Sequence, residues 1–163
     1  MQYYIGPLRK FQFLMIPILG FIFFSTVLVL AFMNNAEVNP LFVLVVLFMI
    51  GGVSIAPWIL FRNYLQYNRD YVLETGEEGF RLRVDNKEYN IKYDEIIAID
   101  EYMNTSVTPW YYCEYWEVKT QSETFRLTSL LISRNDFFVR FPVAENLKRH
   151  SRFLPRIEPT VDM

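Results

Sequence analysis

Two long apolar runs dominate the first third of the chain. Residues 11–33 and 41–61 contain no charged side chain, and Leu, Ile, Val and Phe fill fifteen and fourteen of their positions. An α-helix rises about 1.5 Å per residue, so about 20 residues cross a hydrocarbon core of roughly 30 Å. Helices in soluble cores rarely stay wholly apolar beyond about 14 residues. The pattern therefore predicts a transmembrane helical hairpin over residues 11–62.

Beyond residue 70 the hydrophobic period changes from that of a helix to that of a strand. Alternating or apolar runs bounded by turn residues occupy 71–75, 80–84, 88–93, 96–102, 111–120 and 124–127. Connections of two to five residues between most of these runs predict an antiparallel meander. After Ser133 the apolar spacing is again near-helical, but Pro142 interrupts it. This predicts a broken helix, or two short ones, over about 133–151.

Basic residues in the short flanks predict the orientation of the hairpin. Arg9 and Lys10 precede the first apolar run, Arg62 and Arg69 follow the second, and the connector 34–40 has no basic residue. Positively charged flanks stay on the cytoplasmic side, so we expect a multi-pass protein of the cytoplasmic (inner) membrane with both termini in the cytoplasm. A signal peptide is not expected, because its apolar region would span only about 7–15 residues. The predicted divisions are a flank (1–10), the hairpin (11–62, spans about 11–33 and 41–61), a juxtamembrane linker (63–70), a folded domain (71–153) and a tail (154–163).

Small residues in the second run indicate close helix packing. Gly52 and Ala56 are four positions apart, a spacing that lets two helix backbones approach within one chain or between subunits.

In the first run, Pro17 predicts a kink. Neither run contains an Asp, Glu, Lys, Arg or His. Because ion and proton paths normally require such groups, we do not expect a stand-alone transporter or channel.

An antiparallel sheet of about six strands with one C-terminal helix, in under 100 residues, is typical of a PH-like barrel or sandwich. Residues 73–80 (LETGEEGF), 93–96 (YDEI) and 124–132 before the predicted helix resemble bacterial membrane-anchored PH-like proteins of the YcxB-like type. The resemblance implies two N-terminal spans followed by a cytoplasmic domain. The predicted fold is thus a membrane α-helical hairpin plus an α+β domain, a PH-like antiparallel β-barrel or sandwich closed by a C-terminal helix.

The charge of the predicted domain is divided along the chain. Residues 71–123 hold 12 acids and 5 bases, whereas residues 124–156 hold 2 acids and 7 bases. The basic C-terminal helix could face anionic lipids, and each nearby base would then contribute about 1 kcal/mol to membrane binding. It could instead dock an acidic partner, or lie across the acidic sheet and compensate its charge internally. The acidic turn 76–79 argues against a phosphoinositide site. With a net charge of −2, the chain is not expected to bind nucleic acid.

Residue types needed for catalysis are scarce. His150 and Cys113 are the only residues of their types, and neither has a recognisable triad or zinc-site context. A glycine-rich phosphate loop is also missing from the sequence. We therefore expect no enzyme, no cofactor and no metal site, and Cys113 is expected to be a buried structural thiol.

The run 110–116 (WYYCEYW) is the most aromatic part of the chain. In a strand, Trp110, Tyr112, Glu114 and Trp116 would share one face, which leaves the other face for a partner or membrane surface, or buried as well. The candidate partner or membrane-surface contacts are Arg9, Lys10, Arg62, Arg134, Arg140, Lys148, Arg149, Arg152, Trp110, Tyr112 and Trp116.

These observations predict a non-catalytic, membrane-anchored adaptor or accessory subunit. Its cytoplasmic PH-like domain would bind a protein partner or form a homo-oligomer, in contact with membrane lipids. The alternative is a lipid- or stress-sensing protein that places the basic C-terminal helix against anionic lipids.

Overall fold

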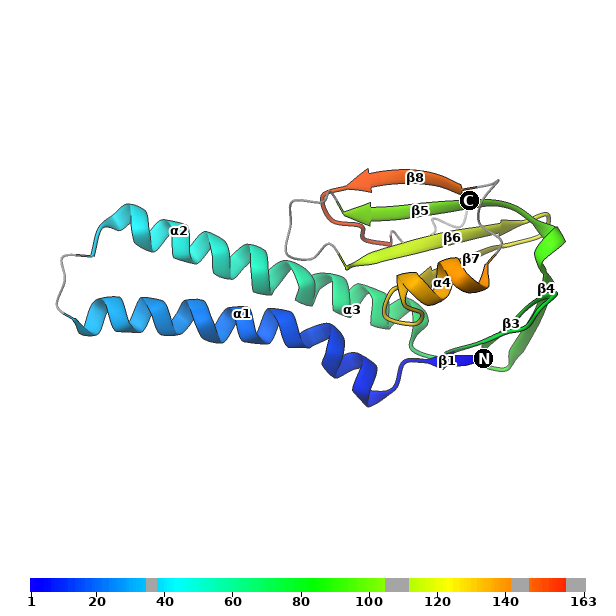
Figure 1. Cartoon of the computed structure of the whole chain (residues 1–163), viewed down its shortest axis with the longest axis horizontal. Helices are drawn as coiled ribbons and strands as arrows, with labels where there is room; N and C mark the ends of the chain where they lie inside the picture. The colour runs from blue at the N-terminus through cyan, green and yellow to red at the C-terminus, as the bar shows by residue number, and fades with distance from the viewer. Residues whose placement is uncertain (35–37, 105–111, 142–146, 158–163) are drawn as a thin grey trace.

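The computed structural model describes residues 1–34, 38–104, 112–141 and 147–157 of the chain. Figure 1 shows two long helices lying side by side and projecting from a domain built of two sheets. The helical elements are α1 (Pro7–Met33), α2 (Pro40–Ile50), the π-helix η1 (Gly51–Ile55), α3 (Ala56–Asn68), the 3₁₀-helix η2 (Tyr93–Glu95) and α4 (Arg134–Arg140). The strands are β1 (Gln2–Tyr4), β2 (Tyr71–Thr75), β3 (Gly79–Val84), β4 (Lys87–Lys92), β5 (Ile96–Asn104), β6 (Glu114–Thr120), β7 (Thr124–Thr128) and β8 (Leu147–Arg152).

Helix α1 has the length and composition to cross a membrane, and it is the one helix in the described ranges that meets both conditions. Its most apolar 18-residue window has a mean hydropathy of 2.6, and 11% of that window is buried. This exposure is unlike that of a core helix in a soluble protein. Helix α2 is apolar but has 11 residues. Of the two predicted spans, the structure therefore gives one candidate, α1.

The backbone nevertheless stays helical from α2 through η1 into α3. Gly51 and Ala56, at the two junctions, both have right-handed helical dihedral angles. The juxtamembrane linker predicted for 63–70 is therefore mostly helix instead. Its polar residues lie on the helix face that meets the domain, because Leu60, Asn63 and Tyr64 are buried at helical spacing. At the same end of the pair, α1 contains Pro17 and bends in its first turns (Figure 1).

The two sheets have the strand orders β1-β2-β3-β4 and β7-β6-β5-β8. Strand β1 pairs antiparallel with β2, with Tyr3 opposite Leu73, although the helices separate the two strands in sequence. The N-terminal ammonium group of Met1 also donates a hydrogen bond to the carbonyl of Thr75, 2.8 Å away. The segment predicted as a flank, 1–10, thus contributes the first strand of the domain. The prediction of a barrel or sandwich is confirmed only as far as two sheets with a helix: the sheets do not close on each other, so the barrel alternative is wrong.

The C-terminal segment differs from the predicted helix over 133–151. Helix α4 ends at Arg140, and Phe141 has extended dihedral angles, as expected for a residue that precedes a proline. Strand β8 then pairs with β5 in parallel, with Glu101 opposite Arg149. The basic residues of 147–152 therefore lie on a strand and not on a helix. The C-terminal helix of the prediction is present as the seven residues of α4.

The main core lies between the two sheets and α4. The ring of Trp116 stacks on that of Phe137, with centroids 4.2 Å apart, and Phe137 stacks in turn on Phe141 at 4.4 Å. A second cluster lies under α3, where Tyr115 packs with Tyr64. Strand β6 is therefore buried on both faces, which is the second of the two alternatives for the aromatic run 110–116.

Candidate functional site

Helix α3 is fastened to the domain by two asparagine side chains. The Asn68 amide nitrogen donates to the carbonyl of Arg126 at 2.8 Å, and its oxygen accepts from the backbone nitrogen of Thr128 at 2.9 Å. Asn63 makes the same pair of bonds with the carbonyl and nitrogen of Ile157, at 3.0 and 2.8 Å. Each amide thus satisfies a backbone donor and a backbone acceptor in a buried setting. These bonds fix α3 against β7 and against the end of the described chain.

Two further contacts fix the helices to the domain. The hydroxyl of Tyr64 on α3 donates to the carbonyl of Pro155 at 2.8 Å. On α1, the guanidinium of Arg9 donates to the carbonyl of Leu130 at 3.4 Å and to that of Ser129 at 3.1 Å. Both helices therefore make specific polar contacts with the domain, which is attached to them directly and not through a flexible linker.

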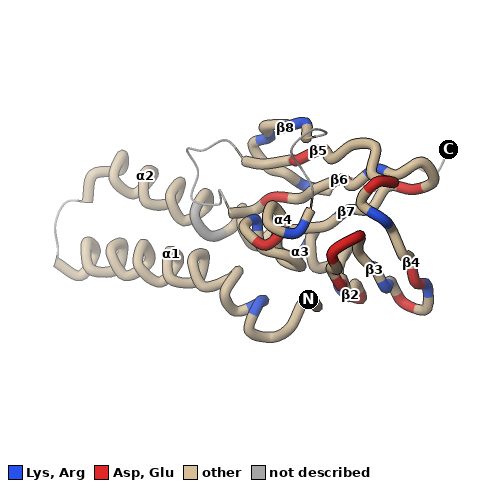
Figure 2. Tube along the Cα trace, turned by 45° about the vertical axis from the view of Figure 1, so that its right-hand side comes forward, with Lys and Arg blue, Asp and Glu red and all other residues tan. Residues whose placement is uncertain are grey.

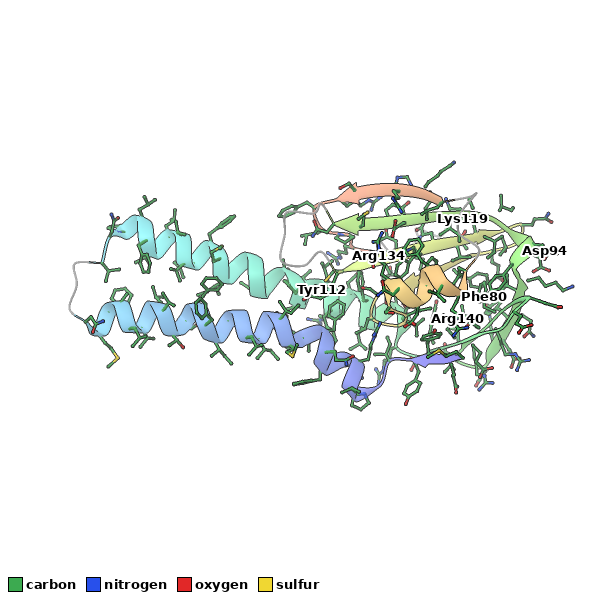
Figure 3. The ribbon with its side chains drawn as sticks, viewed as in Figure 1. Phe80, Asp94, Tyr112, Lys119, Arg134 and Arg140 are labelled. Atoms are coloured by element: carbon green, nitrogen blue, oxygen red, sulfur yellow. The ribbon has the colours of Figure 1, made fainter. Side chains whose placement is uncertain are left out.

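A pocket of about 650 Å³ lies where α1 meets the domain, and we call it the junction pocket. Residues of α1, β5, β6 and α4 and of the turn after β7 line it. Figure 3 shows Tyr112 and Arg134 at this junction. The lining residues used below are Arg9, Gln12, Phe13, Ile16, Glu114, Arg134 and Asn135.

A charge cluster of two buried glutamates, Glu101 and Glu114, and two partly exposed arginines, Arg134 and Arg149, borders the pocket. Glu101 and Glu114 are 0% and 2% exposed. Arg134 donates to Glu114, and its second terminal nitrogen lies 2.9 Å from Oε1 of Glu101. That second contact is an ion pair without hydrogen-bond alignment, so Oε1 of Glu101 has no hydrogen-bond partner in the described part of the chain. Arg149 donates to the other oxygen of Glu101 at 3.0 Å.

Burial raises the pKa of Glu114 to about 7. Arg134 favours the charged carboxylate and opposes the rise, while the negative charge of Glu101 adds to it. The side chain therefore changes its charge near neutral pH, at the wall of the junction pocket.

Residues 2–139 match a family described as a PH domain. The chain belongs to the PH-domain family. The match begins in β1, passes through the helices and ends in α4, so the helical hairpin interrupts the PH domain between its first two strands. No curated protein and no solved structure matches the chain. PH domains commonly bind lipids or proteins.

The basic end of the PH domain is compensated by the domain's own sheet. His150 lies 2.8 Å and Lys119 2.5 Å from the carboxylate of Asp100. Burial alone would raise the pKa of Asp100, but the hydrogen bonds from these two residues lower it overall. The guanidinium of Arg152 lies over the ring of Tyr102, 4.6 Å from its centroid. Together with the contacts of Arg149, this matches the interpretation of internal compensation.

The predicted contact residues are divided between these sites and the open surface. Arg9 and Arg134 meet at the junction pocket, Arg149 belongs to the charge cluster, and Arg152 covers Tyr102. The others are Lys10, which is half-buried, and Arg62, Arg140 and Lys148, which are exposed. In the described ranges, the basic residues 147–152 lie on β8, so the predicted basic helix that would face a lipid surface is not found there.

The aromatic and small residues predicted as contacts lie inside the molecule where the structure describes them. Trp116 is fully buried, and the Tyr112 ring packs edge-on against Phe13 of α1 at 5.2 Å. Trp110 lies outside the described residues. Gly52 is half-buried in η1, which lies against α1, and Ala56 packs onto the second cluster.

Sequence reasoning did not predict that Glu101 and Glu114 both contact Arg134. Glu101 follows Asp100, and two adjacent acids in a strand give no local signal of burial. The alternation of β6 placed Glu114 on the same face as Trp116, which was a usable signal of burial. In the described ranges, no group of three His, Cys, Asp or Glu residues is placed to hold a metal ion.

Proposed function

We propose that the chain is a non-catalytic, membrane-anchored PH-domain protein that acts as an adaptor or accessory subunit. Its PH domain would bind a protein partner at the cytoplasmic face of the inner membrane. The observation that carries the proposal is the attachment of the domain to α3 by Asn63, Tyr64 and Asn68. A domain fixed in this way holds its surfaces at a constant height and orientation above a membrane, as a docking platform requires.

The exposed apolar surface of the helical pair supports two membrane spans and not one. Large apolar side chains such as Phe23 on α1 and Phe48 on α2 are 62% and 79% exposed, which is costly in water. Because α2, η1 and α3 form one helix, the uncharged residues 41–61 are long enough to span despite the short α2. Figure 2 shows the charged residues gathered on the domain and on the first turns of α1. The flanking bases favour an orientation with both termini in the cytoplasm.

Strand β8 is the surface that best fits a protein partner. Like β1, β4 and β7, it has one neighbour among the described strands, here β5, so its other edge offers backbone donors and acceptors, and it is the most basic of these edges. Lys148 and Ser151 are exposed on it. An extended segment with acidic side chains could add to this edge as a further strand, with Lys148 contributing a favourable charge.

The test uses the full chain in its own membranes. A photo-crosslinking amino acid is placed at Ser151 on β8 or, as the matched control, at Lys87 on β4, the edge of the other sheet. We expect Ser151 to give one crosslinked partner that also co-purifies at a fixed ratio in mild detergent, and Lys87 to give none. A chain that purifies alone as a monomer, without crosslinks from either position, would refute the adaptor function.

The membrane anchoring has its own test. The chain should stay in the membrane fraction after a carbonate wash, and protease added to sealed right-side-out cells should leave the domain intact. Release by carbonate would contradict the two spans, and digestion would contradict the cytoplasmic orientation.

A further inference from the structure

We propose that the junction pocket binds one membrane amphiphile with an anionic headgroup. The headgroup would lie against Arg9, and the apolar chain would lie along α1. This inference rests on the proposed membrane anchoring but not on a protein partner. It concerns a different surface from the edge of β8, and a ligand of a different class.

The wall of the pocket changes from polar to apolar along one face of α1. Its residues Arg9, Gln12, Phe13 and Ile16 recur at the spacing of a single helix face. They cover roughly 10 Å along the helix axis. The change from Gln12 to Phe13 falls where the predicted span begins, at residue 11. A ligand along this wall therefore needs a polar end in the interface and an apolar end in the hydrocarbon.

The polar end of the pocket has donors that the protein does not use. Arg9 is held in place because Nε and Nη2 donate to the carbonyls of Leu130 and Ser129. Its remaining terminal nitrogen, Nη1, has no partner among the described residues, and neither do the side-chain amides of Gln12 and Asn135. A guanidinium fixed in orientation with free N–H groups is suited to a phosphate or carboxylate.

Arg9 is the charged group of the pocket that is best placed for an anion. Arg134 is paired with Glu114 and Glu101, whereas the hydrogen bonds of Arg9 go to neutral carbonyls and the carboxylate of Asp136 acts on it only through its charge. A headgroup ammonium would meet the positive charge of Arg9. A pocket of about 650 Å³ is within the range of about 300–1,000 Å³ typical of small-molecule sites, so it can hold a headgroup with part of a chain.

The experiment is native mass spectrometry of the full chain, purified in mild detergent and mixed with phosphatidylglycerol. We expect one retained lipid per chain. Gln12→Trp would fill the mouth of the pocket and lower the retained fraction about tenfold or more. Phe11→Trp is the matched control, because Phe11 is adjacent and exposed but does not line the pocket, and it should leave binding unchanged. Arg9→Gln should lower occupancy by about tenfold through loss of a charged donor.

Three outcomes would overturn the inference. Equal retention of phosphatidylcholine would contradict the anionic headgroup. Displacement of the lipid by soluble glycerol phosphate at similar concentration would show that the ligand is a free phosphate and not an amphiphile. An equal loss in Phe11→Trp and Gln12→Trp, with unchanged circular dichroism, would place the lipid elsewhere. The carbonate wash is run on the unsubstituted chain: retention in the membrane without bound phosphatidylglycerol overturns this inference alone, whereas release overturns the anchoring.

Discussion

Replacement of Glu114 by glutamine should stabilise the protein at pH 8 and leave its stability nearly unchanged at pH 4. Glu114 is 2% exposed and its pKa is raised to about 7 by burial, against an ordinary value of 4.5. Glutamine has nearly the same shape as the protonated acid and can still accept the hydrogen bond from Arg134. The variant therefore keeps the contacts of the neutral form and never bears the cost of a buried charge.

The sign and size follow from the two pKa values. Between pH 4.5 and 7 the folded chain keeps a proton on Glu114 that the unfolded chain has released, so the free energy of unfolding falls as the pH rises. Each pKa unit corresponds to 1.36 kcal/mol, so the loss above pH 7 is about 3 kcal/mol. Glu114→Gln removes this loss. For a chain of this length the gain at pH 8 corresponds to a rise in Tm of roughly 6–12 °C.

The assay is thermal unfolding of the full chain in mild detergent at pH 4 and at pH 8, followed by circular dichroism. Glu117→Gln is the control for removal of one carboxylate from the same strand, since Glu117 pairs with Arg126. A change in Tm with pH that both variants show is caused by the overall charge of the domain and not by Glu114. If Glu114→Gln lowers the Tm at pH 8, the carboxylate is stabilised by Arg134 more than it is destabilised by burial, and the reasoning fails.

Three further changes test separate parts of the structure. Gly79→Ala should destabilise the domain by about 1–3 kcal/mol in urea unfolding, because the new Cβ would lie 2.2 Å from a backbone oxygen of β4. Gly76→Ala is the control: its Cβ would lie 3.5 Å from the nearest backbone atom, and the midpoint of unfolding should not change. Asn68→Ala leaves a donor and an acceptor of β7 unsatisfied and should cost about 2–3 kcal/mol in the same assay, and an unchanged midpoint would contradict the role of Asn68 in attaching α3. Burial raises the pKa of the Cys113 thiol, so maleimide should label it only after unfolding, and rapid labelling of the folded chain would contradict its burial.

Local sequence patterns predicted most of the strands and the apolar helices, because these depend on periodicity within a few residues. Strand β3 and the turn before it followed from the alternation in 80–84 and the glycines that flank the turn. Strand β1 could not be predicted in this way. It has three residues, and its partner β2 lies more than 60 positions away, so only the tertiary structure makes it a strand.

Strand β8 shows a different limit of sequence analysis. Phe137, Phe141 and Leu147 recur at a spacing that fits a helix, but the first two belong to the core beside α4 and Leu147 belongs to β8. Residues 147–152 form a strand because of their contacts with β5: Asp100 and Glu101 on β5 form ion pairs with His150 and Arg149 on β8. The candidate site was hidden for the same reason. Its members come from β5, β6, α1 and α4, and no local motif unites them.

The position of the hairpin within the PH domain connects the two apolar helices to the folding of the sheet. Tyr4 and Val72 are opposite each other in β1 and β2, and closing so long a loop in a flexible chain costs entropy before any strand pairing is gained. Two helices lying side by side bring the start of α1 and the end of α3 to the same end of the pair, as Figure 1 shows. Once they have packed, β1 and β2 meet with little further loss of entropy. The pairing of the apolar helices therefore has a role in folding as well as in the proposed anchoring, because it places the two strands from which the first sheet is built.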